Sequence, residues 1–205
     1  MLVDGYSCIV DKKTLIFDLD ETLIHCNEDP TMPCDAVIAI KFPHGDTIEA
    51  GINIRPYAME CLVELNKYYE IVVFTASHSC YANVALDYLD PEEKYIQHRL
   101  FRDHCMTTPE GLYIKDLRIL ANRDPKDVII VDNAVYSFGF QLENGIPIIP
   151  FYFNKQDVEL KSLTSYLKKL AQVPDVREMN KKVFKLHSYT SSENADEVLT
   201  KLLSK

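Results

Sequence analysis

A short apolar segment that ends in two aspartates constrains this chain more than any other feature. Residues 14–17 have the pattern of a buried β-strand, and Asp18 and Asp20 follow at once. Because side chains alternate along an extended chain, residues two apart share one face. Neighbouring carboxylates repel each other unless a cation lies between them, and Mg²⁺ prefers such oxygen ligands. The alternative is a strand end before a helix start, where Asp, Glu and Thr are favoured caps.

Strand and helix patterns alternate along the rest of the chain. We expect further strands at residues 71–74, 99–101, 128–131 and 146–149, and helices that start at Arg55-Pro56 and cover residues 79–89 and 157–170. A polar loop at residues 27–35 precedes a hairpin of residues 36–42 and 47–54. Residues 106–111 predict a turn, 112–114 an extended segment and 117–121 a helical turn. This order predicts an α/β fold whose mostly parallel sheet is flanked by helices, with a small β insertion at residues 27–54.

Polar side chains follow three of the buried strands. Asp18 follows the first, Thr75 follows Phe74, and Asp132-Asn133 follow Val131. Ligands of open α/β sheets bind beyond the carboxyl ends of the strands. In a parallel sheet these residues would therefore meet at one edge, with Lys115 nearby. The convergence favours a functional site over a helix cap.

The residues at this edge suit phosphoryl transfer. An aspartate beside Mg²⁺ can attack phosphorus and form an aspartyl-phosphate, and a second carboxyl can move the proton of the leaving oxygen and of the attacking water. A hydroxyl and a lysine can hold the phosphoryl oxygens. Asn133 can complete the metal shell, with Asp132 acting directly or through water.

Composition and missing motifs exclude several classes of function. With 22 Lys and Arg against 31 Asp and Glu, the net charge of −9 argues against a direct nucleic-acid surface. No P-loop, dinucleotide-binding or G-x-S-x-G motif is present. The six cysteines lack zinc-site spacing, so we expect reduced thiols. No secretory signal or membrane-spanning run is visible. We therefore expect an intracellular protein, nuclear or cytoplasmic.

Five segments together resemble a known family. They are Asp18-Leu19-Asp20-Glu21-Thr22-Leu23, Phe74-Thr75-Ala76-Ser77 with Tyr81-Ala82, Arg99-Leu100-Phe101-Arg102 with Cys105, Tyr113-Ile114-Lys115-Asp116-Leu117, and Val131-Asp132-Asn133. Their order is similar to that of the FCP/SCP branch (NLI-interacting-factor-like) of the haloacid dehalogenase superfamily. These small phosphatases act on the phosphorylated C-terminal domain of RNA polymerase II and related phosphoproteins. The resemblance covers residues 14–170.

The resemblance implies a role for each matching residue. Asp18 would be the nucleophile, and Asp20 the acid and base, with its backbone carbonyl on the metal. The metal set would be Asp18, Asp20, Asn133 and Asp132, with Asp132 in support, and the phosphate-binding set would be Thr75, Lys115 and Arg102. Arg102 would alternatively form a structural ion pair, and Thr22 would buttress the loop. The implied activity is an Mg²⁺-dependent protein serine/threonine phosphatase, whose partner is a phosphoprotein segment such as the RNA polymerase II C-terminal domain.

Three departures from the family pattern bear on the substrate. Ala134-Val135 follow Asn133 where the branch usually has Ser-Pro. His78 stands where an apolar residue commonly adjoins the pocket for a substrate proline. The insertion, which would line the substrate groove, is polar at residues 27–29. These departures concern the preference for the polymerase tail, whereas the catalytic set matches the family. Two alternative functions stand beside the protein phosphatase, a small-molecule phosphatase of the same superfamily and a catalytically idle scaffold.

The C-terminal tail predicts two amphipathic helices. One carries Val176, Met179 and Val183; the other covers residues 195–202 after a loop at 188–192. We expect a phosphatase domain at residues 1–172 and a helical extension at 173–205 that packs on it.

Overall fold

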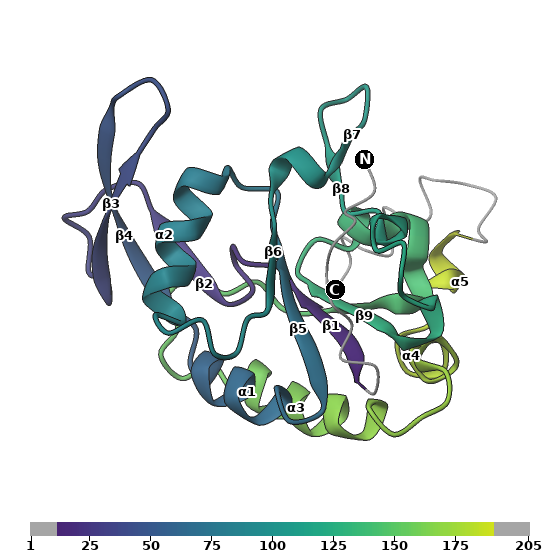
Figure 1. The fold of residues 1–205 in the computed structure, drawn as a ribbon. Coiled ribbons are helices and arrows are strands. Elements are labelled where there is room, and N and C mark those ends of the chain that lie inside the picture. Colours follow the sequence, from purple (N-terminus) through teal and green to yellow (C-terminus); the bar gives the residue numbers. More distant parts are fainter. Residues whose placement is uncertain (1–11, 191–205) are drawn as a thin grey trace.

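A parallel sheet of five strands forms the centre of the molecule. The computed structural model describes residues 12–190. The strand order is β10-β9-β1-β5-β6, and each neighbouring pair is parallel. The strands are β1 (Lys13–Phe17), β5 (Tyr69–Phe74), β6 (His98–Leu100), β9 (Val128–Asp132) and β10 (Gly145–Pro147). The α/β fold with a parallel sheet is thus confirmed, and the sheet lies between helical segments (Figure 1).

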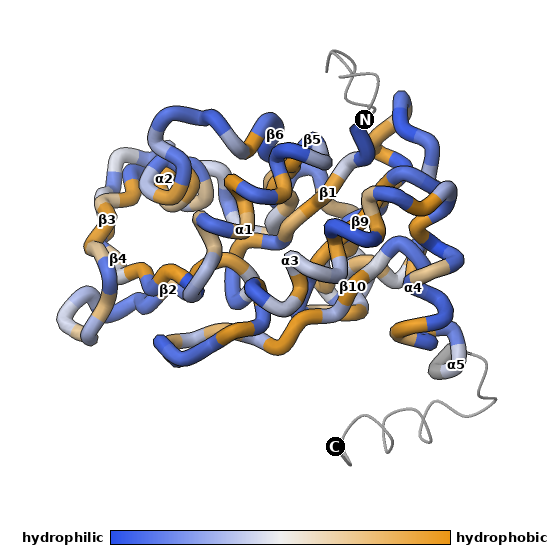
Figure 2. The backbone as a smooth tube through the Cα atoms, turned by 90° about the horizontal axis from the view of Figure 1, so that it is seen from below, coloured by the Kyte–Doolittle hydropathy of each residue, from blue (hydrophilic) through white to orange (hydrophobic). Residues whose placement is uncertain are grey.

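Alternate residues of the central strands pack on opposite faces of the sheet. Leu15 and Phe17 of β1 join the core under the α-helices, whereas Ile16 joins a second core. The helices are α1 (Ala58–Leu65), α2 (Ser79–Leu89), α3 (Glu159–Leu170), α4 (Val176–Phe184) and the short α5 (His187–Thr190). The second core includes residues of the 3-10 segments η2 (Leu117–Ile119) and η4 (Val135–Asn144). The buried central strands are mainly hydrophobic along their length (Figure 2).

The β insertion forms a separate antiparallel sheet of three strands. Its order is β2-β4-β3, with β2 (Ile24–Asn27), β3 (Ala36–Lys41) and β4 (Thr47–Ile54). The predicted hairpin is confirmed, and Gly45 supplies the left-handed turn with a φ of 102°. The hairpin projects to the side of the main sheet in Figure 1. The sequence analysis missed β2, which begins directly after the aspartate-containing loop.

A second small hairpin lies near the carboxyl edge of the main sheet. It pairs β7 (Met106–Thr107) with β8 (Tyr113–Ile114). The turn predicted for residues 106–111 is therefore wrong at its first two residues, which are strand. The turn itself ends at Gly111, whose φ of 85° is left-handed.

The first helix starts later than predicted. α1 begins at Ala58, and its N-cap Tyr57 has a left-handed φ of 65°. Arg55 lies outside the helix, and its side chain is fully buried. It forms an ion pair with Asp157 and donates to the backbone carbonyl oxygens of Thr22 and Ile149. It thereby ties the loop after β1 to the loop before α3.

The C-terminal helices pack on the domain as far as they are described. Val176 is buried, and Asn180 accepts a hydrogen bond from Tyr166 and donates to the carbonyl oxygen of Glu143. Residues 188–190, predicted as loop, belong to α5. The helix predicted at residues 195–202 lies outside the described residues, and the boundary at residue 172 stays a prediction.

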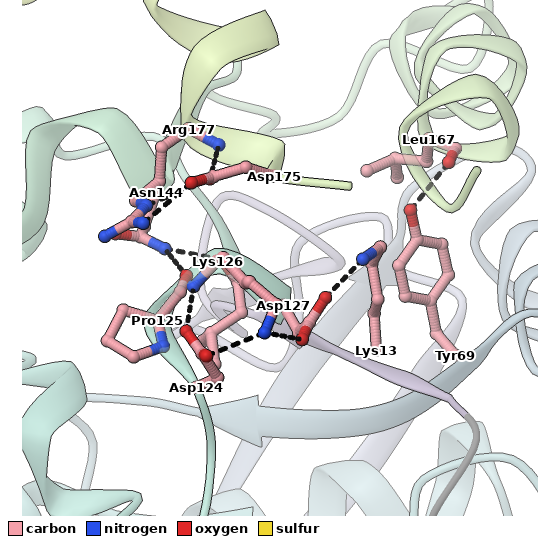
Figure 3. Close-up of polar contacts among 11 residues, drawn as sticks. Lys13, Tyr69, Asp124, Pro125, Lys126, Asp127, Asn144, Leu167, Asp175 and Arg177 are labelled. Atoms are coloured by element: carbon pink, nitrogen blue, oxygen red, sulfur yellow. Dashed lines mark hydrogen bonds and ion pairs between the residues drawn. The ribbon is translucent and has the colours of Figure 1, made fainter. Parts of the chain in front are cut away.

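Polar contacts join the segments at the amino ends of the sheet strands, as Figure 3 shows. Asp175 caps α4 by accepting from the backbone N–H of Arg177. Lys13 pairs with Asp127, and the Tyr69 hydroxyl donates to the carbonyl oxygen of Leu167 at 2.6 Å. Within residues 12–190, no helix has the length and apolar character needed to cross a membrane.

Candidate active site

A pocket of about 370 Å³ opens at the carboxyl ends of β1, β5 and β9. Each predicted site residue contributes to its wall: Asp18, Asp20, Thr75, Arg102, Lys115, Asp132 and Asn133. The structure therefore brings together the residues that the sequence placed at separate strand ends. Parallel pairing of β1 with β5 and β9 is the cause, since it sets the ends of these strands side by side.

Lys115 joins two aspartates at the floor of the pocket. Its ammonium contacts Oδ1 of Asp18 and lies 2.7 Å from Oδ2 of Asp132, and all three side chains are buried. Asp132 also accepts from the Ser137 hydroxyl at 2.6 Å and from the backbone N–H of Ala134. Both oxygens of its carboxylate thus accept hydrogen bonds from the protein, which favours a supporting role for Asp132 over direct metal coordination.

Burial and the neighbouring charges act together on the pKa values of this group. Burial raises the pKa of Asp18 to about 7, against the lowering effect of the Lys115 ammonium, while Asp132 and Asp20 add to the rise. Burial also opposes the charge of Lys115, but its two carboxylate partners outweigh this and raise the pKa of its ammonium. A further cation beside Asp18 would favour the ionised form that a nucleophile needs.

The Asp20 carboxylate is held by three hydroxyl groups from the β5–α2 region. It accepts from Tyr81 at 2.6 Å, from Ser77 at 2.7 Å and from Thr75 at 3.3 Å. Burial, followed by the charge of Asp20, raises the pKa of Tyr81 above its usual value, so the phenol remains a donor. Thr75 thus contacts Asp20 from the strand end, and Ser77 and Tyr81 complete the set from the following turn and α2.

The Asn133 amide meets two oxygens at the Asp18 side of the pocket. One of its terminal atoms lies 3.2 Å from Oδ2 of Asp18 and 3.3 Å from the backbone carbonyl oxygen of Asp20. The amide nitrogen in this place would donate to both oxygens, whereas the amide oxygen, which a bound cation requires there, leaves three acceptors with no hydrogen between them. Adjoining ligands of an octahedral Mg²⁺ ion are separated by about 3.0 Å, given metal–oxygen bonds of about 2.1 Å. These residues therefore fit Mg²⁺.

The loop that carries the aspartates is fixed by its own backbone. Thr22 is buried and donates to Oδ2 of Asp18 at 3.0 Å, as expected of a buttress. Glu21 adopts a left-handed φ of 57°, and its carbonyl oxygen accepts from the backbone N–H of Phe151. Strain of this kind persists where surrounding contacts hold the chain, and here it turns the loop beneath the pocket.

Arg102 lies at the exposed side of the pocket. Its Nε donates to the carbonyl oxygen of Ala76 at 2.7 Å, and its guanidinium stacks over the ring of Tyr113. Within the described residues no carboxylate lies within 4 Å of this guanidinium, so it forms no structural ion pair there. Its charge is accessible to a ligand.

His78 and the insertion do not reach this pocket. His78 caps α2 and turns toward Cys80, whose sulfur lies 2.9 Å from Nδ1. None of residues 27–54 lines the pocket, so their place in a wider substrate groove stays a prediction. Among residues 12–190, no group of three or more His, Cys, Asp or Glu side chains could hold a metal, and the cysteines there are free thiols.

Ser77, Tyr81 and Ser137 had no role in the sequence-based site. Ser77 and Tyr81 lie in the second motif, so their positions were noted without their contact to Asp20. Ser137 follows Asp132 by five residues and is turned back toward it by η4. Its only sequence signal was closeness to the Asp132-Asn133 pair.

Comparison with known proteins identifies the family. Residues 13–177 match the model of the NLI interacting factor-like phosphatases. The chain is 42% identical over 177 residues to CTD small phosphatase-like protein 3 of Caenorhabditis elegans, covering 86% of this chain and 61% of that protein. It is 35% identical over 166 residues to human carboxy-terminal domain RNA polymerase II polypeptide A small phosphatase 1, covering 81% and 62%. The chain belongs to the NLI interacting factor-like phosphatase family. It spans less than two thirds of the length of each of these two relatives.

The fold agrees with a solved structure described as Fcp1, an essential RNA polymerase II CTD phosphatase. The TM-score is 0.61 at 22% identity, covering 90% of this chain and 55% of that one. The predicted resemblance to FCP/SCP phosphatases and the haloacid-dehalogenase-like fold are thus confirmed.

Proposed function

We propose that this chain is an Mg²⁺-dependent protein serine/threonine phosphatase that acts through an aspartyl-phosphate at Asp18. The observation that carries the proposal is the meeting of Asp18, Lys115 and Asn133 in one pocket beside Asp20. Membership of a phosphatase family supports it. A catalytically idle scaffold would not require this complete set.

The first step transfers the phosphoryl group to the protein. Asp18 attacks phosphorus, and the bond from phosphorus to the seryl or threonyl oxygen breaks. Asp20 gives its proton to that leaving oxygen. Lys115, Thr75 and Arg102 hold the phosphoryl oxygens as charge develops on them.

The second step releases phosphate. Asp20, now a carboxylate, takes a proton from a water molecule, which attacks the phosphorus of the aspartyl-phosphate. The bond between phosphorus and the Asp18 oxygen breaks, and phosphate and the Asp18 carboxylate are restored. The hydroxyls of Ser77 and Tyr81 orient Asp20 in both steps.

Mg²⁺ would be held by the Asp18 carboxylate, the Asn133 amide oxygen and the Asp20 carbonyl oxygen. When bound, it supplies positive charge that offsets the repulsion between Asp18 and the phosphate. Lys115, itself paired with Asp132, would hold Asp18 in position for this role.

A phosphoprotein segment is the substrate class we propose. The elements between β1 and α1 are three short strands set to the side of the sheet (Figure 1), and none of residues 24–54 lines the pocket. Relatives named for the C-terminal domain of RNA polymerase II support this class, and that domain is a candidate substrate in a nuclear or cytoplasmic setting.

The test compares wild type with Asp18→Asn on p-nitrophenyl phosphate and on phosphoserine and phosphothreonine peptides. We expect Asp18→Asn to lose roughly 1,000-fold or more in kcat/KM, because an amide cannot act as the nucleophile. EDTA should abolish wild-type activity and excess Mg²⁺ should restore it. Equal rates for the two proteins would contradict the proposal, and hydrolysis of sugar phosphates but not of peptides would favour the small-molecule alternative.

A further inference from the structure

We propose that Leu112 and Tyr136 form an apolar rim that selects phosphopeptides with an apolar side chain next to the phosphorylated residue. The inference rests on the proposed phosphatase function and names a substrate feature that the pocket would recognise. Both residues line the active-site pocket, yet 44% of Leu112 and 55% of Tyr136 remain exposed.

The two rim residues come from segments that are tied together. Leu112 precedes β8 in the small hairpin, and Tyr136 lies at the start of η4. The backbone N–H of Lys115, just after β8, donates to the carbonyl oxygen of Ser137 at 2.6 Å. Ser137 in turn donates to Asp132, so the rim is anchored to the catalytic floor rather than to a free loop.

The pocket is polar at its floor and apolar on this side of its mouth. Asp18, Lys115 and Asn133 suit the phosphoryl group, whereas Leu112 and Tyr136 offer it no charge. Covering exposed aliphatic and aromatic surface with an apolar side chain is favourable by the area removed from water. A peptide whose phosphate reaches Lys115 would place a neighbouring residue against this rim.

Other residues of the lining offer less apolar surface. Glu21, Ala76 and Ser77 also line the pocket, and Glu21 is acidic in a chain of net charge −9. An apolar neighbouring residue gains contact area at the rim, whereas the exposed guanidinium of Arg102 in the same pocket serves the phosphate.

The test uses phosphoserine peptides that carry Ala, Leu, Phe, Pro, Asp or Lys on either side of the phosphoserine. Turnover of each peptide is measured with wild type in Mg²⁺, and binding is measured separately with the Asp18→Asn protein. On one side, we expect Leu, Phe or Pro to improve kcat/KM and Kd about tenfold over Ala, the scale of a small apolar contact. In the double variant Leu112→Ala/Tyr136→Ala, the ratio of kcat/KM for the apolar peptide to kcat/KM for the Ala peptide should be close to one.

The matched control is Met106→Ala/Phe140→Ala. These residues are similarly exposed on the same hairpin and on η4 but do not line the pocket, so activity and the ratio should both persist. Selective binding without turnover would contradict the proposed phosphatase function but support the proposed role of the rim in peptide selection. Turnover without preference for an apolar residue on either side, or a preference that survives the double variant, would overturn the proposed role of the rim. Absence of both binding and turnover would overturn the phosphatase function and the role of the rim together.

Discussion

Tyr81 is a single side chain that holds Asp20, the residue we propose for proton transfer. Its hydroxyl lies 2.6 Å from Oδ1 of Asp20 and anchors that carboxylate to α2. We predict that Tyr81→Phe lowers kcat on p-nitrophenyl phosphate roughly tenfold, a part of the 100-fold or greater effect typical of a positioned general acid. The KM should change less than kcat, because Asp20 acts on the leaving oxygen. Steady-state kinetics at saturating Mg²⁺ measures both.

Tyr88→Phe is the matched control for this prediction. Tyr88 lies on the same helix, is exposed and does not line the pocket, so its kinetics should equal those of wild type. A Tyr81→Phe enzyme that changes only in KM would assign the hydroxyl to ligand binding and contradict a positioning role.

At the level of single residues, the sequence was sufficient to predict which site residues follow buried strands. Asp18, Thr75 and Asp132 could be placed together because the parallel order of strands dictates where their ends lie. The hydroxyls of Ser77 and Ser137 could not be assigned, since their directions depend on turns set by tertiary contacts. Arg102 was left between two roles until the structure showed a carbonyl partner in place of a carboxylate.

The elements differ in how much of their formation is local. α2 was predicted at residues 79–89 as observed, because a helical apolar face and the Asp90-Pro91 stop lie in the sequence. β2 was missed because its four residues form a strand only by pairing with β4. η4 was also missed, since its course depends on distant partners such as the bond from Asn144 to the carbonyl oxygen of Val128.

The contact between β10 and η4 provides a test at the scale of elements. A Cβ at Gly145 would lie 2.0 Å from the ring of Phe138, which is fully buried. Gly145→Ala therefore forces the ring or the strand to move, and we predict a loss of about 1–3 kcal/mol in the free energy of unfolding. Urea denaturation followed by circular dichroism measures this.

Gly139→Ala is the matched control, because nothing lies within 4 Å of its added methyl. This change on the same η4 segment should leave the free energy of unfolding within about 0.5 kcal/mol of wild type. Equal free energies of unfolding for the two variants would show that η4 and β10 can move apart to fit the methyl group without loss of stability.

At the scale of the whole molecule, the active site joins separate parts of the fold. Asp18 follows β1, Asp132 ends β9, and Lys115 comes from the segment after β8. Burying these charges together is costly unless each is paired, so the residues of the candidate site also bear on the stability of the fold. A ligand that binds only when β1 and β9 lie side by side must therefore stabilise the folded state.

Mg²⁺ should raise the unfolding temperature through this coupling. At a concentration of 100 times Kd, a ligand specific for the folded state adds about 2.7 kcal/mol, which corresponds to roughly 5–10 °C for a chain of this size. Asn133→Ala should lose the shift, whereas Asn154→Ala, an exposed asparagine in the loop before α3, should keep it. Differential scanning calorimetry with NaCl of matched ionic strength separates specific binding from screening of the net charge of −9. A shift of equal size in NaCl, or one that persists in Asn133→Ala, would place the metal elsewhere than beside Asp18.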